Sequence, residues 1–167
     1  SEEMKPTFFD ADSDGDLDLY VVSGGTEFNV NDAALQDHMY LNNGSGQFSE
    51  TKNMLPKNLN FPGMKAAASD IDDDGDLDLF VSGRIIPQKY PYSSPSKLLI
   101  NTGNKFEEQV QENLNNNGIT NDAIWLDVDN DGDDDLITAG EWEPIKLYRL
   151  EDGQLSNAEI LSKSGWW

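Results

Sequence analysis

Aspartates alternate with other residues in three short segments, which begin at Asp10, Asp70 and Asp127. Each segment has the pattern DxDxDGDxD, followed by an apolar residue. Ionised carboxylates at this density repel one another unless a cation lies among them. Around a tight turn the first, third, fifth and ninth side chains converge, the seventh residue offers its backbone carbonyl, and the glycine supplies the positive φ that wraps the loop. Such a set predicts a Ca²⁺ site, which takes roughly six to eight oxygen ligands.

Two alternative interpretations of these segments are a solvated acidic turn and an EF-hand. One segment alone would favour a metal only moderately over a solvated turn, but three copies with repeated flanks favour it strongly. An EF-hand needs a bidentate glutamate at position 12 and helices on both sides. Position 12 is Val21, Val81 or Thr138, and the flanks are rich in strand-forming residues. The sequence therefore argues against an EF-hand.

Short apolar and β-branched runs recur around each acidic segment and predict four strands per copy. Across the three copies the first strands fall at 7–9, 66–68 and 123–126, the second at 19–24, 79–83 and 136–140, the third at 38–41, 97–100 and 146–149, and the fourth at 47–49, 105–107 and 154–156. Asn-Gly and Asp-Gly turn signals between the third and fourth strands favour hairpins. Four-stranded units in tandem are typical of β-propeller blades.

The predicted fold is therefore all-β, a partial β-propeller of three four-stranded antiparallel blades with a calcium-binding loop between strands 1 and 2 of each. One domain spans 1–167, with blades at about 5–50, 62–110 and 118–161 and the start of a further blade at 162–167. In the third copy Asp134 replaces an apolar residue, so its second strand is expected to start one residue later. Propellers close with about four to eight blades. Three blades predict a fragment of a longer propeller or, alternatively, copies that self-associate.

The composition excludes several classes of function. The formal net charge is −21, from 32 acidic and 11 basic residues, which argues against binding to nucleic acid or to anionic lipid. No apolar run approaches the length that would insert in a membrane. With one histidine, no cysteine and no visible acid–base set, the chain is not expected to be an enzyme.

The acidic loop between two strands resembles the FG-GAP (VCBS) repeat of integrin α-subunit-like β-propellers. The pieces 24–28, 83–87, 140–144 and 164–167 also resemble bacterial FG-GAP proteins of the ASPIC/UnbV type. The resemblance implies about three Ca²⁺ ions, one per repeat, since these loops bind Ca²⁺ in the family. Carried over, the ligands are Asp10, Asp12, Asp14, Asp16 and Asp18, then Asp70, Asp72, Asp74, Asp76 and Asp78, and then Asp127, Asp129, Asp131, Asp133 and Asp135.

Loops after the second and fourth strands of a blade lie on the face opposite the acidic loops, and long loops on a rigid scaffold commonly bind ligands. This predicts a ligand face that includes Glu27, Arg84, Glu141 and Trp142. The alternative for Trp142 is packing between blades. Calcium modules with dissociation constants of about 10⁻⁴–10⁻³ M stay empty in the cytosol, so an extracellular, cell-surface or periplasmic location is expected.

The predicted function is therefore a calcium-binding module that binds a protein or a glycan, as in adhesion at a cell surface, with Ca²⁺ in a structural role. Two alternatives stay open from the sequence. One is a purely structural segment of a larger secreted protein, and the other is the propeller part of a carbohydrate-active enzyme.

Overall fold

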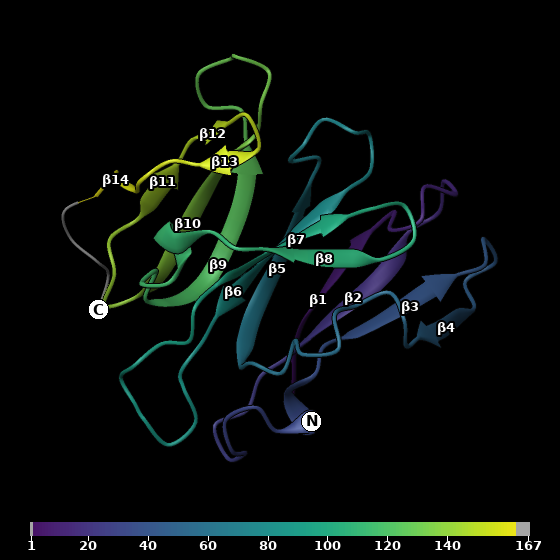
Figure 1. Cartoon of the computed structure of the whole chain (residues 1–167), viewed down its shortest axis with the longest axis horizontal. Helices are drawn as coiled ribbons and strands as arrows, with labels where there is room; N and C mark the ends of the chain where they lie inside the picture. The colour runs from purple at the N-terminus through teal and green to yellow at the C-terminus, as the bar shows by residue number, and fades with distance from the viewer. Residues whose placement is uncertain (1, 163–167) are drawn as a thin grey trace.

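Three four-stranded antiparallel sheets form the framework of residues 2–162, the part of the chain that the computed structural model describes (Figure 1). The first sheet is β1 (Glu3–Phe9), β2 (Asp18–Ser23), β3 (His38–Asn42) and β4 (Phe48–Thr51). The second is β5 (Gly63–Ser69), β6 (Asp78–Gly83), β7 (Lys97–Asn101) and β8 (Phe106–Gln109). The third is β9 (Ile119–Leu126), β10 (Asp135–Glu141), β11 (Lys146–Tyr148) and β14 (Glu159–Ile160). An all-β fold is therefore confirmed.

Helical structure is limited, within this described part, to the single 3₁₀ turns η1 (Ala33–Leu35) and η2 (Glu112–Leu114). Neither turn is long or apolar enough to cross a lipid bilayer, nor is any other helix in residues 2–162. The further blade expected at 162–167 lies outside the described residues, apart from Ser162.

The fourth strand of the third sheet differs from the prediction. Residues 154–156 do not pair with β11; instead β12 (Leu150–Glu151) and β13 (Gln154–Leu155) form a separate hairpin, and β14 takes the edge of the sheet. The hairpin turns inward because Leu150 and Leu155 are buried in the core. Asn113 anchors it, since its side-chain amide donates to the carbonyl of Leu155 at 2.5 Å. The chain therefore returns to the sheet edge only at Glu159.

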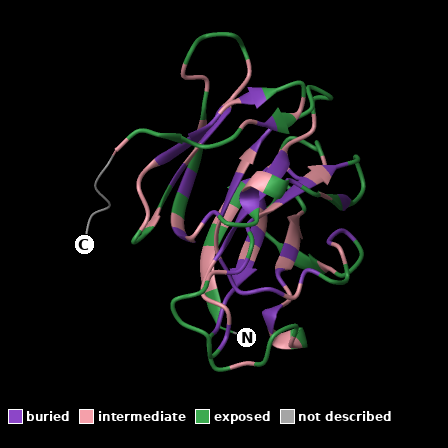
Figure 2. Cartoon of the chain, turned by 60° about the vertical axis from the view of Figure 1, so that its left-hand side comes forward, coloured by how far each residue is buried: buried purple, intermediate pink, exposed green. Residues whose placement is uncertain are grey.

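The sheets stack face to face, and the middle sheet is buried on both sides. Every residue of β6 is buried. Leu79 and Val81 pack into a core shared with the first sheet, whereas Phe80 packs into a second core shared with the third sheet. This division follows from the period of two in a strand, which sends successive side chains to opposite faces. Figure 2 shows the exposed residues concentrated in the loops around these buried strands.

The first strands of the three sheets lie side by side and are joined by side-chain hydrogen bonds. The hydroxyl of Thr7 in β1 donates to the carbonyl of Ala66 in β5 at 2.9 Å. The indole Nε1 of Trp125 in β9 donates to the carbonyl of Ala67 at 3.1 Å. These bonds hold each sheet at a fixed position against the next.

The outer faces of the first and third sheets leave apolar side chains uncovered. Phe8 in β1 occupies the position that Ala68 has in β5, since they pair with Leu19 and Leu79 respectively. Ala68 is partly buried, whereas Phe8 is 56% exposed. On the third sheet Ile124 occupies the position of Ala67 and is 53% exposed. The same strand positions are thus partly or fully buried in the middle of the stack, at Ala68 and Ala67, and open at its two ends.

Candidate metal sites and the opposite cleft

The three acidic loops join the first two strands of each sheet and lie at the same end of the stack (Figure 1). In the first loop Asp10 Oδ2 accepts the backbone N–H of Gly15 at 3.0 Å, and Asp14 Oδ1 accepts that of Asp16 at 3.1 Å. Gly15 has φ of 92°, as predicted for the sixth position. Ser13 also has a positive φ, 59°, which the sequence analysis did not anticipate. The second and third loops repeat both features.

The ninth aspartate of the first and second loops is a structural anchor. Asp18 is fully buried, and its two carboxylate oxygens accept the backbone N–H groups of Ala11 and Asn42, each at 2.8 Å. Asp78 does the same with Ile71 and Asn101, at 2.8 and 2.7 Å. Hydrogen bonds to a carboxylate are about twice as strong as neutral ones. This residue therefore ties its loop to the end of the third strand.

Three carboxylates in each loop come close enough to share an ion. Their nearest oxygens lie within 4.8 Å of one another, in the groups Asp10, Asp12 and Asp18, Asp70, Asp72 and Asp78, and Asp127, Asp129 and Asp131. The other predicted ligands do not join these groups, namely Asp14, Asp16, Asp74, Asp76, Asp133 and Asp135. The prediction therefore included more residues than the structure gathers, although Asp16 keeps a buried oxygen beside the first group.

The oxygens of these groups fit a bound cation. Oδ1 of Asp10, Asp12, Asp16 and Asp70 is buried and has no hydrogen-bond donor among the described residues. A buried carboxylate oxygen without a donor is costly, and a hard divalent cation with all-oxygen ligands satisfies it. Neither cysteine nor histidine lies in the loops, which disfavours zinc.

The pKa values of several loop carboxyls are raised, as expected for acids that are partly buried and lie close together. Burial raises the pKa of Asp78 to about 6, against the two backbone hydrogen bonds that lower it. Burial, together with the charges of neighbouring aspartates, also raises the pKa of Asp12 and Asp72. A cation within each group would reverse these shifts because it stabilises the charged form.

The third loop carries a cationic side chain that the first two lack. Arg149 Nη1 pairs with Asp129 Oδ2 and lies 3.7 Å from Asp135 Oδ2, a buried oxygen without a hydrogen-bond donor. Asp127 in turn uses both its oxygens for backbone N–H groups, those of Asn130 and Gly132. Arg149 was not among the residues predicted from the sequence, although the departure at Asp134 already set this copy apart.

The expectation that the third copy's second strand starts one residue later is wrong. β10 begins at Asp135, the counterpart of Asp18 and Asp78 at the starts of β2 and β6. Asp134 fits in place of an apolar residue because its Oδ2 accepts the hydroxyl of Ser69 at 2.7 Å.

Neighbouring loops meet differently along the stack. Between the first and second loops Ser13 donates its hydroxyl to Asp76 Oδ1 at 2.6 Å. Between the second and third loops the corresponding residues are Asp73 and Asp133, which line a shared 330 Å³ hollow. Burial raises the pKa of Asp133, and the charge of Asp73 raises it further. The hydrogen bond between the first and second loops is therefore replaced by electrostatic repulsion between the second and third.

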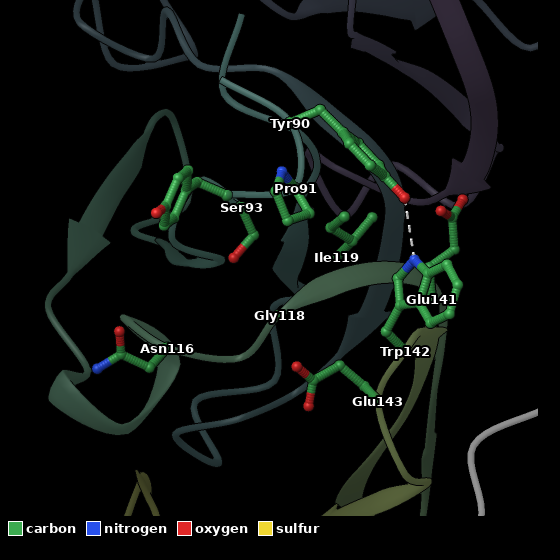
Figure 3. Close-up of a pocket in the computed structure, with 10 residues that line it drawn as sticks. Tyr90, Pro91, Ser93, Asn116, Gly118, Ile119, Glu141, Trp142 and Glu143 are labelled. Carbon is green, nitrogen blue, oxygen red and sulfur yellow. Dashed lines mark hydrogen bonds between the residues drawn. The ribbon is translucent and has the colours of Figure 1, made fainter. Parts of the chain in front are cut away.

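Two of the four residues predicted for the ligand face line a 520 Å³ cleft at the opposite end of the stack (Figure 3). Glu141 and Trp142 belong to it, with Tyr90 and Tyr92 from the connection after β6. Glu27 and Arg84 do not line it. Arg84 instead donates from Nη1 to the Sδ of Met4 at 3.8 Å.

Comparison with known families agrees with the resemblance noted in the sequence. Residues 10–81 match the model of an FG-GAP-like repeat, so the stretch from the first acidic loop to the middle of β6 is a repeat of this kind. No curated protein matches the chain. The third sheet, beyond the matched stretch, has the same acidic loop between its first two strands.

Proposed function

We propose that the chain is a calcium-stabilised part of a β-propeller, whose three sheets are blades, and that its end opposite the acidic loops binds a protein or glycan ligand. The single observation that carries the calcium role is the set of buried carboxylate oxygens without hydrogen-bond donors in the acidic loops. Hydrogen bonds to the ninth aspartate prearrange these oxygens before any ion arrives, so the ion closes a loop that is already shaped.

Calcium would contribute a large part of the stability. An ion that binds only the folded state stabilises it by RT ln(1 + [L]/Kd), or about 1.4 kcal/mol per site at millimolar calcium and a dissociation constant near 10⁻⁴ M. Two such sites and a weaker third give about 3 kcal/mol, against a typical domain stability of about 5–15 kcal/mol. Sites this weak need the calcium concentration found outside the cytoplasm, which supports an extracellular, cell-surface or periplasmic location.

Thermal melting with calcium, with magnesium and with a chelator tests the calcium role. We expect the melting temperature to rise by several degrees in millimolar Ca²⁺ and much less in Mg²⁺, which prefers stricter octahedral geometry. Asp72→Asn, which weakens one group, should reduce the rise, whereas Asp122→Asn on an exposed part of β9 should leave it unchanged. Equal melting temperatures in calcium and chelator would rule the proposal out.

The uncovered outer faces support the propeller part of the proposal. Phe8 and Ile124 stand at positions that are partly or fully buried in the middle sheet, where another sheet packs against them. The outer faces of the first and third sheets are equivalent in strand position to faces that the middle sheet buries against its neighbours. Either further blades of a longer chain or a second copy of this chain would therefore cover them. Adjacent blades of a propeller pack in this repeated way, which protects both the apolar faces and the strand edges.

A further inference from the structure

Asn101, the buried last residue of β7, reaches with its side-chain amide from the second sheet to the first acidic loop. Its Nδ2 donates to the backbone carbonyl of Ala11 at 2.9 Å and, at 3.3 Å, to that of Leu77 in the loop of its own sheet. Its Oδ1 accepts the N–H of Gly103 at 3.1 Å, which fixes the orientation of the amide. The second sheet is therefore tied to the first acidic loop by a buried hydrogen bond.

The two residues that this bond joins are also bonded to the anchoring aspartates of the two loops. The N–H of Ala11 donates to Asp18 Oδ2 at 2.8 Å. The N–H of Asn101 donates to Asp78 Oδ1 at 2.7 Å. Asp18 belongs to the first carboxylate group and Asp78 to the second. A buried path of hydrogen bonds therefore connects the two groups, with Ala11 and Asn101 as its intermediate residues.

The exposed parts of the same two loops are joined as well, by the bond that the Ser13 hydroxyl donates to Asp76 Oδ1. Ser13 directly follows Asp12 of the first carboxylate group, and Asp76 lies shortly before Asp78 of the second. An ion that orders either loop would therefore hold in place one partner of both contacts with the other loop.

Within the described part of the chain, these two bonds do not recur between the second and third loops. Leu150 occupies the position of Asn101, since its N–H also donates to the ninth aspartate of its loop, but its side chain has no donor. Asp73 stands where the first loop has its serine. Ser69 donates to Asp134 instead, and Asp134 is not in the third carboxylate group. The first two groups are thus connected more directly than the last two.

We infer that Asn101 is a positioning residue shared by the first two proposed calcium sites, and that it makes their calcium binding cooperative. The inference rests on the proposed calcium role. An ion at one site fixes its loop, and the contacts through Asn101 and Ser13 then hold the neighbouring loop close to its bound arrangement, so the next ion has less of the chain to order. Linkage makes this effect reciprocal. The third site, without these contacts, is coupled to the second more weakly.

Calcium titration of the isotopically labelled chain, followed by NMR, tests the inference. The N–H groups of Gly15, Gly75 and Gly132 donate to the first aspartate of their loops, so their signals report the three sites separately. Asp72→Asn weakens the second site directly, and we expect it to weaken the first site about three- to tenfold as well. Asp129→Asn, the same change at the third site, should weaken the second site much less.

Removal of the bond between the sheets should then reduce the coupling. We expect the effect of Asp72→Asn on the first site to shrink in the Asn101→Ala chain and to shrink further when Ser13→Ala is added. Asn42→Ala is the matched control, because Asn42 ends β3 and donates to the carbonyl of Leu17 within its own loop. The coupling is a ratio of two affinities in one background, so a general loss of stability or affinity cancels.

The possible outcomes separate this inference from the proposal on which it rests. A first site whose affinity is unchanged by Asp72→Asn would overturn the inference alone, as would coupling that survives the loss of both Asn101 and Ser13 side chains. Coupling lost equally in Asn42→Ala would also overturn it. A first site that binds more tightly after Asp72→Asn would mean that repulsion between the ions outweighs the contacts. Glycine signals that do not respond to calcium would overturn the calcium proposal together with the inference.

Discussion

The guanidinium group of Arg149 lies among the carboxylates of the third acidic loop, paired with Asp129 through Nη1. The side chain also reaches Asp135 Oδ2, at 3.7 Å, and its Nε donates to Glu159 Oε1 at 3.1 Å. Strand pairing puts Leu41 and Ile100 at the same position in the first two sheets. Within residues 2–162, only the third loop therefore holds a fixed positive charge among its carboxylates.

Replacing Arg149 with leucine should strengthen calcium binding at the third loop. In the parent chain a Ca²⁺ ion there has to displace the guanidinium group or tolerate its repulsion, so we expect this site to bind about tenfold more weakly than the other two. Arg149→Leu should bring its affinity close to theirs, as measured by calorimetric titration. Arg149→Lys, which keeps the charge, is the matched control. Three equal sites in the parent chain would contradict this prediction.

Asp73→Ser should stabilise the chain when calcium is absent. The change recreates at the second and third loops the contact between Ser13 and Asp76, with a serine hydroxyl able to donate to Asp133 in place of a like charge. One hydrogen bond contributes about 0.5–1.5 kcal/mol, and the lost repulsion adds to it. For a chain of this size we expect a rise in melting temperature of about 2–4 °C in chelator. The reverse change, Ser13→Asp, should lower it.

Features that repeat in the sequence were predictable, whereas features that depend on contacts between the repeats of the chain were not. The loop pattern and its flanks predicted strands β1 to β11 at nearly their observed places, and the glycine at the sixth position has the expected φ. The turn at 151–153 was predicted, but the departure of the Leu150–Leu155 hairpin from the sheet was missed because it depends on burial and on the distant Asn113. Trp142 was predicted for the ligand face, but its bond to Tyr90 crosses between sheets and has no signal in the local sequence.

Asp37 should give the chain a stability that falls as the pH rises from about 4 to 7. It is buried, accepts the hydroxyl of Tyr20 at 2.5 Å and the N–H of Ser23 at 2.6 Å, and has a pKa raised by burial to about 7. Between the unfolded pKa and the folded one, the folded chain holds a proton that the unfolded chain has released. The free energy of unfolding therefore decreases with pH, by at most about 1.4 kcal/mol per pH unit.

Asp37→Asn should remove this pH dependence, because the amide stays neutral and still offers one acceptor and one donor to Ser23 and Tyr20. The quantity to measure is the difference between parent and variant in the free energy of unfolding by urea, from pH 4 to 8 in saturating calcium. Contributions from the acidic loops cancel in that difference. A difference that does not change with pH would contradict the raised pKa.

The uncovered sheet faces predict head-to-tail association of the isolated chain at high concentration. Inside the stack, neighbouring sheets contact each other through two different faces, and Phe80 lies on the face that packs against the next sheet. An end-to-end contact of the same kind would bring Ile124 of one copy against Phe8 of another. Such a contact is heterologous, because each copy contributes a different surface. Sedimentation velocity at increasing concentration should show the association, and Phe8→Lys or Ile124→Lys alone should abolish it.

Mixing the two variants provides the sharper test of this geometry. The Phe8→Lys chain keeps its third-sheet face intact, and the Ile124→Lys chain keeps its first-sheet face intact, so the mixture should form a dimer and nothing larger. Both positions are more than half exposed in the single chain, so neither lysine should lower its melting temperature by more than about 1–2 °C. Two variants that each still dimerise alone would point to contacts between like faces instead.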